Sequence, residues 1–462
     1  MPKRNFIWIV GIISAAIVTM WVTRKTPRNG SLSPDDTADV AEAYRLIREN
    51  YYAPIDGRAL RQGAVKGMVG SLDEFSTYVP PERVAAFESR MRGLECGLGL
   101  RVAKSGHVAE VLGAIFGSPA YKRGMRSGDR ITSINGQDVA GLSAKQIEQL
   151  LAGPAGTQIA MTIVSPGAAQ RTVTLTCRQF GLQSVQGLYR AENEQWTCLI
   201  DTSAGIAYLR VTELVNDTGS QFRRVFRQIP AVRALVLDLR DNPGGLLPAA
   251  LDLADMFLSD GPIVTVASSG EALQQYESHA EGTLLDLPMV VLVNNSTASA
   301  AEIVAGALRC NDRAVLVGTC TRGKGCIQSM YKLAGGLGRV NLTTAEFFFG
   351  DGPQGGGEAA CGMRGIEPHV QVTIQPAQMD AIRRGWIHAQ LPLEAPPAER
   401  ERLPADQVVD PVTARALRRD PQLARAVQLL QEPQRMERIL ARAARLRAAE
   451  KASSTPEGSA QP

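Results

Sequence analysis

The order of apolar and polar positions in the second half of this chain predicts a mixed α/β core. From about residue 190 to residue 390, short apolar runs alternate with stretches in which apolar residues recur at helical spacing. Five runs have the length and composition of buried strands: Ile206–Val211, Ala234–Leu239, Pro262–Val266, Met289–Val293 and Ala314–Val317. Helices are predicted after two of them, over Leu246–Phe257 and Ala300–Leu308.

The first 28 residues carry a different pattern, a single long apolar run. Phe6–Thr23 has about the length needed to span a bilayer, and basic residues flank it on both sides. No small-residue Ala-x-Ala cleavage site follows the run, which favours an uncleaved signal anchor over a removed signal peptide. The sequence therefore predicts one N-terminal transmembrane helix within residues 1–28.

Helical spacing also occurs on either side of the central part of the chain. Residues 29–93 are predicted to hold a polar linker and an N-terminal helical region, whose apolar positions over Val40–Met68 fall into two pieces. Residues 393–451 are predicted to form a C-terminal helical region, and the polar residues 452–462 a disordered tail.

Composition narrows the class of protein. The chain has 462 residues and is 44% hydrophobic, which is enough for at least two domains besides the anchor. The net charge of +4 is small for this length, so a nucleic-acid partner is not indicated. No group of side chains has the spacing of metal ligands, and neither a metal ion nor a cofactor is predicted. The seven cysteines are widely spaced, and Cys320 and Cys326 are predicted to be reduced and buried.

A serine and a lysine in two small-residue turns are the strongest candidates for chemistry. Ser299 is expected at a tight turn, because it follows the apolar run Met289–Val293 and opens the helix Ala300–Leu308. Lys324 lies in a glycine-flanked turn downstream. A serine hydroxyl needs a base, and a lysine amine can take the proton only if burial lowers its pKa, a shift that costs on the order of 4 kcal/mol. The pair predicts a hydrolase with a Ser/Lys dyad.

An acyl-transfer site also needs two hydrogen-bond donors for the developing oxyanion, each worth roughly 3–4 kcal/mol. The backbone N–H of Ala300, at the start of a predicted helix, is one candidate. The second lies in the turn after the strand Ala234–Leu239, at Gly244 or Gly245, because glycine lets the backbone approach a substrate closely. Sequence alone does not distinguish the two glycines, and such a turn is equally common as a plain strand-to-helix connection.

Each of these residues also has an ordinary structural explanation. Taken alone, Ser299 would be a helix N-cap, Lys324 a solvated turn residue and Gln328 a surface polar residue. A histidine base is a minor alternative, with His279 as its candidate, because none of the four histidines has an evident acidic partner. Gly318–Gly325 nearly matches a phosphate-binding loop, but it ends in glycine where serine or threonine is required, and a strand is predicted to follow.

At these residues the chain resembles the C-terminal processing (tail-specific) serine peptidases, over about residues 38–430. In this resemblance Ser299 matches the nucleophile, Lys324 the general base and Gln328 the residue that orients the lysine. Three further segments match the family in its order: Ser71–Tyr78, Asp238–Gly245 and Gly365–His369. The resemblance implies an α/β crotonase-like peptidase core, here residues 181–392, in a multidomain α+β chain.

The match has two departures. The family usually has an aromatic residue where Thr321-Arg322 precede the lysine turn, and an aspartate where this chain has His369. They leave a catalytically inactive PDZ-containing scaffold at a membrane as the main alternative to an enzyme.

Residues 94–180 resemble a PDZ domain inserted before the core. Five residues are expected to form its carboxylate-binding loop: Cys96, Gly97, Leu98, Gly99 and Leu100. The backbone amides of such a loop can hold the carboxylate of a peptide C-terminus. The amphipathic stretch Ala144–Leu151 would line the groove with Ile147 and Leu151, although these side chains are equally suited to the core of the domain.

The residues and the resemblance together lead to one functional prediction. We expect a membrane-anchored serine endopeptidase that binds protein or peptide substrates with exposed C-termini and hydrolyses bonds near them. The resemblance implies a bacterial-type cell membrane protein with a single-pass anchor and its catalytic part on the periplasmic or extracytoplasmic side. It also makes a homodimer, formed through the N-terminal helical region, a candidate state.

Overall fold

The structure of the chain is a computed structural model. It describes residues 34–268, 273–280, 287–349, 365–390, 401–403, 407–409 and 416–454. The predicted membrane-spanning run Phe6–Thr23 lies outside these residues. Within them, no helix combines the length and the hydrophobicity that crossing a bilayer requires. The chain divides into two compact units, Met1–Ser71 and Leu72–Pro462, which are described separately.

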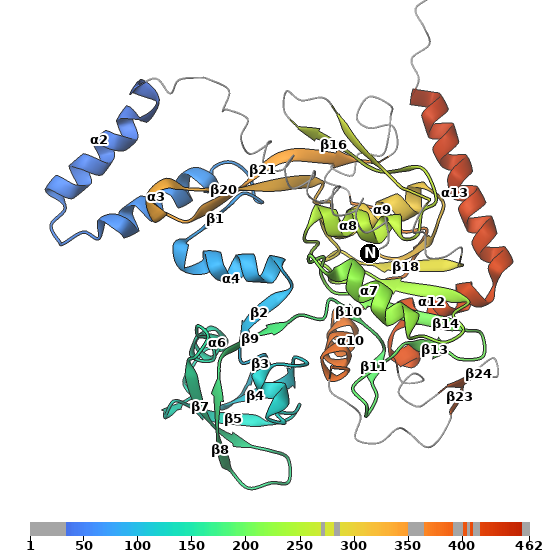
Figure 1. Ribbon diagram of the computed structural model, residues 1–462, viewed down its shortest axis with the longest axis horizontal. Helices are drawn as coiled ribbons and strands as arrows, with labels where there is room; N and C mark the ends of the chain where they lie inside the picture. Colours follow the sequence, from blue (N-terminus) through green and yellow to red (C-terminus); the bar gives the residue numbers. More distant parts are fainter. Residues whose placement is uncertain are drawn as a thin grey trace, which may run out of the picture. The chain divides into compact units, whose positions relative to one another are not determined.

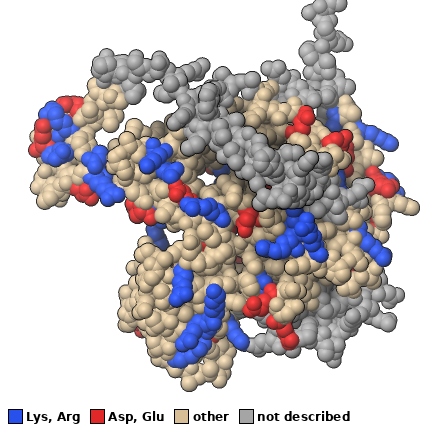
Figure 2. All heavy atoms as spheres, viewed as in Figure 1, with Lys and Arg blue, Asp and Glu red and all other residues tan. Residues whose placement is uncertain are grey.

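The first unit contains two helices, α2 (Pro34–Asn50) and α3 (Gly57–Gly70), which correspond to the two helical pieces expected from the sequence. The helix α3 begins after Asp56, whose carboxylate accepts a hydrogen bond from the N–H of Arg58 at 2.8 Å. Side chains of both charges lie on α2 (Figure 2), and Arg45 pairs there with Glu42 at 2.7 Å. Several large hydrophobic side chains on the described part of this unit are nevertheless exposed: Val40, Leu46, Ile47, Tyr51, Tyr52 and Met68.

The second unit starts with a short connecting region and a small β domain. The connecting region consists of β1 (Thr77–Val79), α4 (Pro81–Met91) and β2 (Leu94–Gly97). The domain consists of β3 (Leu100–Ser105), β4 (Val108–Ala114), α5 (Pro119–Lys122), β5 (Arg130–Ile134), β6 (Gln137–Asp138), α6 (Ala144–Leu150), β7 (Gln158–Val164), β8 (Arg171–Thr176) and β9 (Arg178–Gly181). Its antiparallel sheet has the order β3-β4-β5-β7-β8, so β3 is an edge strand, and α6 packs near it.

A seven-stranded sheet forms the centre of the remaining part of this unit (Figure 1). Its strands are β10 (Val185–Gln186), β13 (Leu199–Asp201), β14 (Ile206–Val211), β15 (Ala234–Asp238), β18 (Met289–Val293), β19 (Val315–Gly318) and β22 (Val370–Gln371). The strands β14, β15, β18, β19 and β22 run parallel in that order. Parallel pairing brings the carboxyl ends of these strands to one edge, where α/β sheets hold their sites.

Helices cover both faces of this sheet, which explains why the strands β14, β15 and β18 are buried along their whole length and mostly apolar. One face packs on α7 (Thr218–Arg227), α8 (Leu247–Asp255) and α9 (Ala300–Cys310). The other packs on α12 (Pro421–Gln431) and the start of α13 (Pro433–Ser454) (Figure 1). Side chains alternate between the two faces: in β15, Leu235 and Leu237 face the first group of helices, and Val236 faces the second.

A second, antiparallel sheet packs against the first group of helices. It is formed by β1, β16 (Pro262–Ser268), β17 (Gln274–Glu277), β20 (Cys326–Lys332) and β21 (Arg339–Phe348). The remaining elements are the pair β11 (Tyr189–Arg190) and β12 (Trp196–Thr197), the 3-10 turn η1 (Ala334–Gly336), the helix α10 (Pro376–His388) and the pair β23 (Glu401–Leu403) and β24 (Gln407–Val409). The mixed α/β class expected from the sequence is confirmed.

The C-terminal region differs from the expected one in two details. The hairpin β23–β24 lies within residues 393–451, which were expected to be helical. The helix α13 continues to Ser454, into the predicted disordered tail. The sequence from Pro433 onward is rich in Ala, Arg, Glu and Leu, all strong helix formers, and this explains why the helix is longer than expected.

Candidate active site

Ser299 lies at the turn between β18 and α9, as the apolar pattern predicts. Its backbone has φ 56° and ψ −123°, a conformation that residues other than glycine rarely adopt. The hydroxyl of Thr297 holds the turn, because it donates to Leu239 O at 2.9 Å and accepts from the N–H of Asn294 at 3.0 Å. A strained strand-to-helix turn of this kind is typical of an exposed nucleophile.

Glu302 joins the serine turn to the lysine turn. One carboxylate oxygen, Oε2, accepts from the backbone N–H of Ser299 at 2.8 Å and of Lys324 at 2.9 Å. The other, Oε1, accepts from the hydroxyl of Thr321 at 2.5 Å and from the N–H of Gly323 at 2.8 Å. The Glu302 residue is only 1% exposed, so these four donors replace the water that a buried carboxylate loses. The two candidate catalytic residues are thus fixed to one side chain.

The amine of Lys324 is half-buried beside the segment that leads into β1. Its Nζ lies 5.2 Å from the centre of the Phe75 ring and makes no hydrogen bond or ion pair with any described residue. Burial lowers the pKa of this amine below its usual range, and the neighbouring Arg322 lowers it further, against an opposing effect of Cys326. A lowered pKa is what a lysine needs to act as a general base.

Gln328 follows on β20, but it does not contact the lysine as the resemblance implies. Its Nε2 donates to Cys326 Sγ at 3.1 Å and to Cys326 O at 3.4 Å, and no hydrogen bond to Lys324 exists among the described contacts. Its orienting role stays a prediction. Cys326 is buried, as expected, whereas Cys320 is only partly buried because it lies in the loop before the lysine turn. Neither forms a disulfide with a described residue.

The glycine turn after β15 lies directly against the serine turn. A Cβ atom added to Gly244 would lie 2.9 Å from Ser299 Cβ and 2.8 Å from Ala300 N, so only glycine permits this approach. The N–H of Gly244 donates to Asn242 Oδ1 at 2.8 Å. In the described structure the N–H groups of Gly245 and Ala300 have no hydrogen-bond partner. The N–H of Gly244 is thus already bonded whereas that of Gly245 is not, a difference that the sequence does not reveal.

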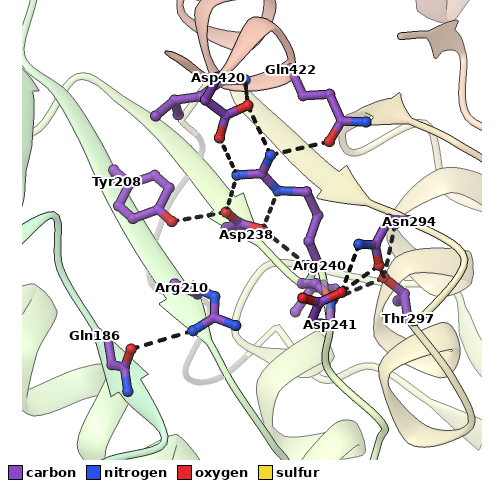
Figure 3. A network of polar contacts seen from close by, with 12 residues as sticks. Gln186, Tyr208, Arg210, Asp238, Arg240, Asp241, Asn294, Thr297, Asp420 and Gln422 are labelled. Atoms are coloured by element: carbon purple, nitrogen blue, oxygen red, sulfur yellow. Dashed lines mark hydrogen bonds and ion pairs between the residues drawn. The ribbon is translucent and has the colours of Figure 1, made fainter. Parts of the chain in front are cut away.

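A buried ionic network holds the glycine turn in place (Figure 3). The side chain of Arg240 is fully buried and forms ion pairs with Asp238 at 2.6 Å and with Asp420, at the start of α12, at 2.7 Å. Its remaining donors reach Gln422 Oε1 at 3.1 Å, and Tyr208 donates to Asp238 at 2.8 Å. Although burial opposes its charge, the two carboxylates raise the pKa of Arg240 well above its usual range. Every donor of this guanidinium is therefore satisfied.

The residues expected to bind a peptide tail lie in the β domain and at the end of β2, the strand that leads into it. Cys96 and Gly97 are on β2 and pair with β9. Leu98, Ile147 and Leu151 lie in the hydrophobic core of the domain, and Leu100 packs against that core. Gly99 has φ 72°, and a Cβ there would collide with Ser118 Cβ at 2.1 Å, so the loop requires glycine at this point. Contact of these residues with a peptide stays a prediction.

The structure does not support the two alternative sites, a histidine base and a phosphate-binding loop. His279 lies 3.6 Å from Asp255, but its side chain is 75% exposed. The amides of Gly323 and Lys324, which a phosphate loop would offer to an anion, donate to Glu302 instead, and the strand β20 follows them.

Comparisons with known proteins identify the family. A family model described as Peptidase family S41 matches residues 205–372, and a PDZ domain model matches residues 110–165. A third, described as the N-terminal domain of the activating protease CtpB, matches residues 16–82. The chloroplastic C-terminal processing peptidase of Tetradesmus obliquus is 33% identical over 359 residues, which cover 74% of this chain and 75% of that protein. The chain belongs to the S41 family of C-terminal processing peptidases.

A further curated relative and a solved structure are also similar to this S41 peptidase. The carboxy-terminal-processing protease of Bartonella bacilliformis is 29% identical over 356 residues, 75% of this chain and 79% of that protein. The solved structure of a photosystem II D1 C-terminal processing protease is 29% identical and has a TM-score of 0.42, with 72% of this chain and 91% of that chain covered. The protein is a serine-type peptidase with a PDZ domain.

Two departures of the S41 peptidase from its family pattern have structural roles. The hydroxyl of Thr321 donates to Glu302 and accepts from the N–H of Ile366 at 2.7 Å. These bonds connect the lysine turn to the segment that precedes β22. His369 accepts through Nδ1 from the N–H of Leu316 at 2.9 Å. Burial lowers the pKa of His369 to about 4, and nearby arginines add to this, so the ring is neutral at ordinary pH.

The sequence analysis missed the roles of Glu302 and Phe75. A signal for Glu302 exists: the Ser-x-x-Glu spacing from Ser299 is that of a capping box, in which the glutamate accepts from the backbone of the first residue. Phe75 is held by Asp73, whose carboxylate accepts from the N–H groups of Phe75 at 2.7 Å and Ser76 at 2.6 Å. No pattern within one segment predicts that this ring reaches Lys324, because the whole PDZ domain lies between the two residues in the sequence.

Proposed function

We propose that this peptidase hydrolyses peptide bonds with Ser299 as nucleophile and Lys324 as general base. The observation that carries the proposal is the double acceptance by Glu302 Oε2, which fixes the backbones of both residues to one atom. The half-buried amine, which has no hydrogen-bond partner among the described residues, supports the role of the lysine, since an ammonium fixed in an ion pair could not take a proton.

The reaction follows from these positions. Ser299 Oγ attacks the scissile carbonyl carbon as its proton passes to Lys324 Nζ, and the carbonyl oxygen becomes an oxyanion. The free N–H groups of Ala300 and Gly245 are the proposed donors to that oxyanion. The C–N bond then breaks as the lysine returns the proton to the leaving amine, which leaves an ester on Ser299. A water molecule, deprotonated by the same amine, hydrolyses the ester and restores the free serine.

The test is cleavage of an unfolded protein by single-residue variants. Ser299→Ala and Lys324→Ala are each expected to lower kcat by at least ~10³-fold, because each removes one half of the reacting pair. Lys332→Ala, an exposed lysine at the end of the same strand β20, is the matched control and should retain wild-type activity. Substantial cleavage by a folded Ser299→Ala protein, checked by circular dichroism, would rule out the mechanism and revive the scaffold alternative.

We also propose that Phe6–Thr23 anchors the peptidase in a bacterial-type membrane. Its PDZ domain is proposed to select substrates by binding their C-terminal tails, and its peptidase core is proposed to have a crotonase-like fold. The apolar run and the family resemblance support the anchor. The edge strand β3 beside α6 supports tail binding, since a peptide can extend an open sheet edge. Release of the full chain from membranes by alkaline carbonate would refute the anchor, and failure of a tail peptide to compete with substrate would refute tail selection.

A further inference from the structure

A cavity beside the glycine turn contains an arginine that no described residue pairs with. The cavity has a volume of about 470 Å³ and lies between the end of β14, the turn after β15, the helix α10 and the PDZ strand β4. Its walls include Arg210, Thr212, Glu213, Asp241, Pro243 and Trp386. The strand β4 closes one side and packs tightly on α10, since a Cβ at Gly113 would lie 2.7 Å from the side chain of Ile387.

Arg210 is unusual for a buried charge. It is only 9% exposed, and its guanidinium stacks on the Trp386 ring at 3.8 Å. Its one hydrogen bond is to Gln186 Oε1 at 3.4 Å, its Nε has no partner, and it forms no ion pair with any described residue. Figure 3 shows that Arg210 lies next to the Asp238–Arg240–Asp420 network but forms no hydrogen bond or ion pair with these three residues. A buried guanidinium with free donors is costly unless an anion completes it.

The other arginines of the cavity are already paired. Arg383 pairs with Asp241 at 2.6 Å, and Arg90 pairs with Glu213 at 3.2 Å. Arg210 is therefore the one guanidinium of the cavity without an ion pair to a described residue, and only the carboxylates of Asp238 and Asp241 act on its charge, from a longer distance. One charge matches a monoanion, and the two carboxylates on the walls disfavour a group with a second negative charge.

The chain around Arg210 links the cavity to the turn that lies against Ser299. The chain runs from β14, which carries Arg210, to Leu214, which forms an isolated β-bridge with Gly245 and donates its N–H to Gly244 O at 2.9 Å. Gly244 in turn lies against Ser299. A polypeptide that reacts at Ser299 can thus place a neighbouring residue in the cavity.

We propose that this cavity is a subsite for a carboxylate of the substrate and that Arg210 binds it. The stacking on Trp386 fixes the plane of the guanidinium and leaves its edge for two parallel hydrogen bonds, the geometry that suits a planar carboxylate. The carboxylate is either the C-terminal group of the tail or a Glu or Asp side chain near the scissile bond. The proposal rests on reaction at Ser299, but binding can be measured without it.

The experiment measures equilibrium binding of fluorescent peptides to the full-length Ser299→Ala protein and to the Ser299→Ala/Arg210→Met double variant. Methionine keeps most of the length and the apolar contact with Trp386 but removes the charge. One peptide pair differs by a C-terminal acid or amide, and the other, amidated in both members, differs by Glu or Gln near the scissile bond. In at least one pair, loss of Arg210 should reduce the carboxylate preference by about 10- to 100-fold.

The comparison of ratios separates this site from others. A carboxylate that binds at the PDZ loop contributes equally to the affinity of the proteins with and without Arg210, so its contribution cancels when their carboxylate preferences are compared. Arg90→Met, which lines the same cavity, serves as the matched control and should leave both preferences intact. Changes below about twofold in both pairs, with a folded Arg210→Met protein, overturn the proposal. The pair that responds identifies the source of the carboxylate, and cleavage by the wild-type enzyme tests the proposed function separately.

Discussion

Glu302 and Phe75 show how single residues set the chemistry of this site. Glu302 accepts four hydrogen bonds from two turns and has no ion pair with a described residue. Phe75 reaches the lysine from a segment that precedes the PDZ domain. The candidates Ser299 and Lys324 could be predicted because each sits in a local pattern of apolar strand and small-residue turn. The residues that connect them could not, because their partners are set by the folded chain.

Replacement of Glu302 by glutamine should lower kcat. The amide group of glutamine would face two N–H or O–H donors and leave them unpaired, which costs roughly 1–3 kcal/mol for a buried group. We expect a fall of about 10- to 100-fold in kcat together with a lower Tm. Steady-state cleavage and thermal unfolding would measure both effects. Glu277→Gln, at an exposed position on β17, should change neither, and an unaltered kcat in Glu302→Gln would show that the two turns hold their positions without the carboxylate.

Substitutions of Phe75 should shift the pH dependence of the rate in opposite directions. The ring both excludes water from Lys324 and attracts its ammonium form. Phe75→Ala lets water in, so the pKa of the amine should rise and the active, neutral form should appear at higher pH. Phe75→Leu keeps the burial without the ring, so the pKa should fall and the profile should move to lower pH. A profile of kcat/KM against pH for the three proteins measures this, and identical profiles would disprove contact between ring and amine.

At the scale of elements, the site depends on a helix far away in the sequence. The turn after β15 is positioned by Arg240, and Arg240 is completed by Asp420, whose Oδ1 also caps α12 by accepting from the N–H of Leu423 at 3.0 Å. The strands β14 and β18 have the bounds that the apolar runs predict, because a parallel strand that is buried on both faces is mostly apolar. Their order in the sheet and the link to α12 depend on packing, which no single segment encodes.

Asp420→Asn should destabilise the second unit strongly. It removes one carboxylate from a guanidinium that is entirely buried, and breaking such a pair typically costs about 3–5 kcal/mol. Denaturant unfolding would give the difference, and cleavage should weaken as the glycine turn loosens. The control is Glu432→Gln, which breaks the exposed pair with Arg435 and should have little effect. Equal stability of the two variants would contradict the importance assigned to the network.

At the scale of the whole molecule, the chain combines two units with different surfaces. The second unit buries its apolar strands and helices in three hydrophobic clusters. The first unit exposes large apolar side chains on short helices, an arrangement that favours association. The order of these regions was predictable from composition and spacing, and the assembly they form was not, since one sequence does not reveal which exposed face meets a partner.

We expect the protein to form a homodimer through its first unit. The double substitution Leu46→Lys/Ile47→Lys places two charges among the exposed apolar residues of α2 and should raise the dissociation constant of the dimer by ~10-fold or more. Sedimentation of the protein lacking residues 1–28 measures this. Arg45→Ala, on the same helix, should leave the dimer intact. A monomer for the unsubstituted protein at micromolar concentration would refute the expectation.

The late position of Asp420 has a consequence for biosynthesis. A ribosome makes the serine turn, the lysine turn and the glycine turn long before it reaches the helix that neutralises Arg240. Until then, Arg240 has only Asp238 as an ion-pair partner, and the glycine turn lacks the contact with α12 that holds it in the folded chain. We therefore expect the nascent peptidase to reach full activity only after α12 has been made and has packed on the sheet.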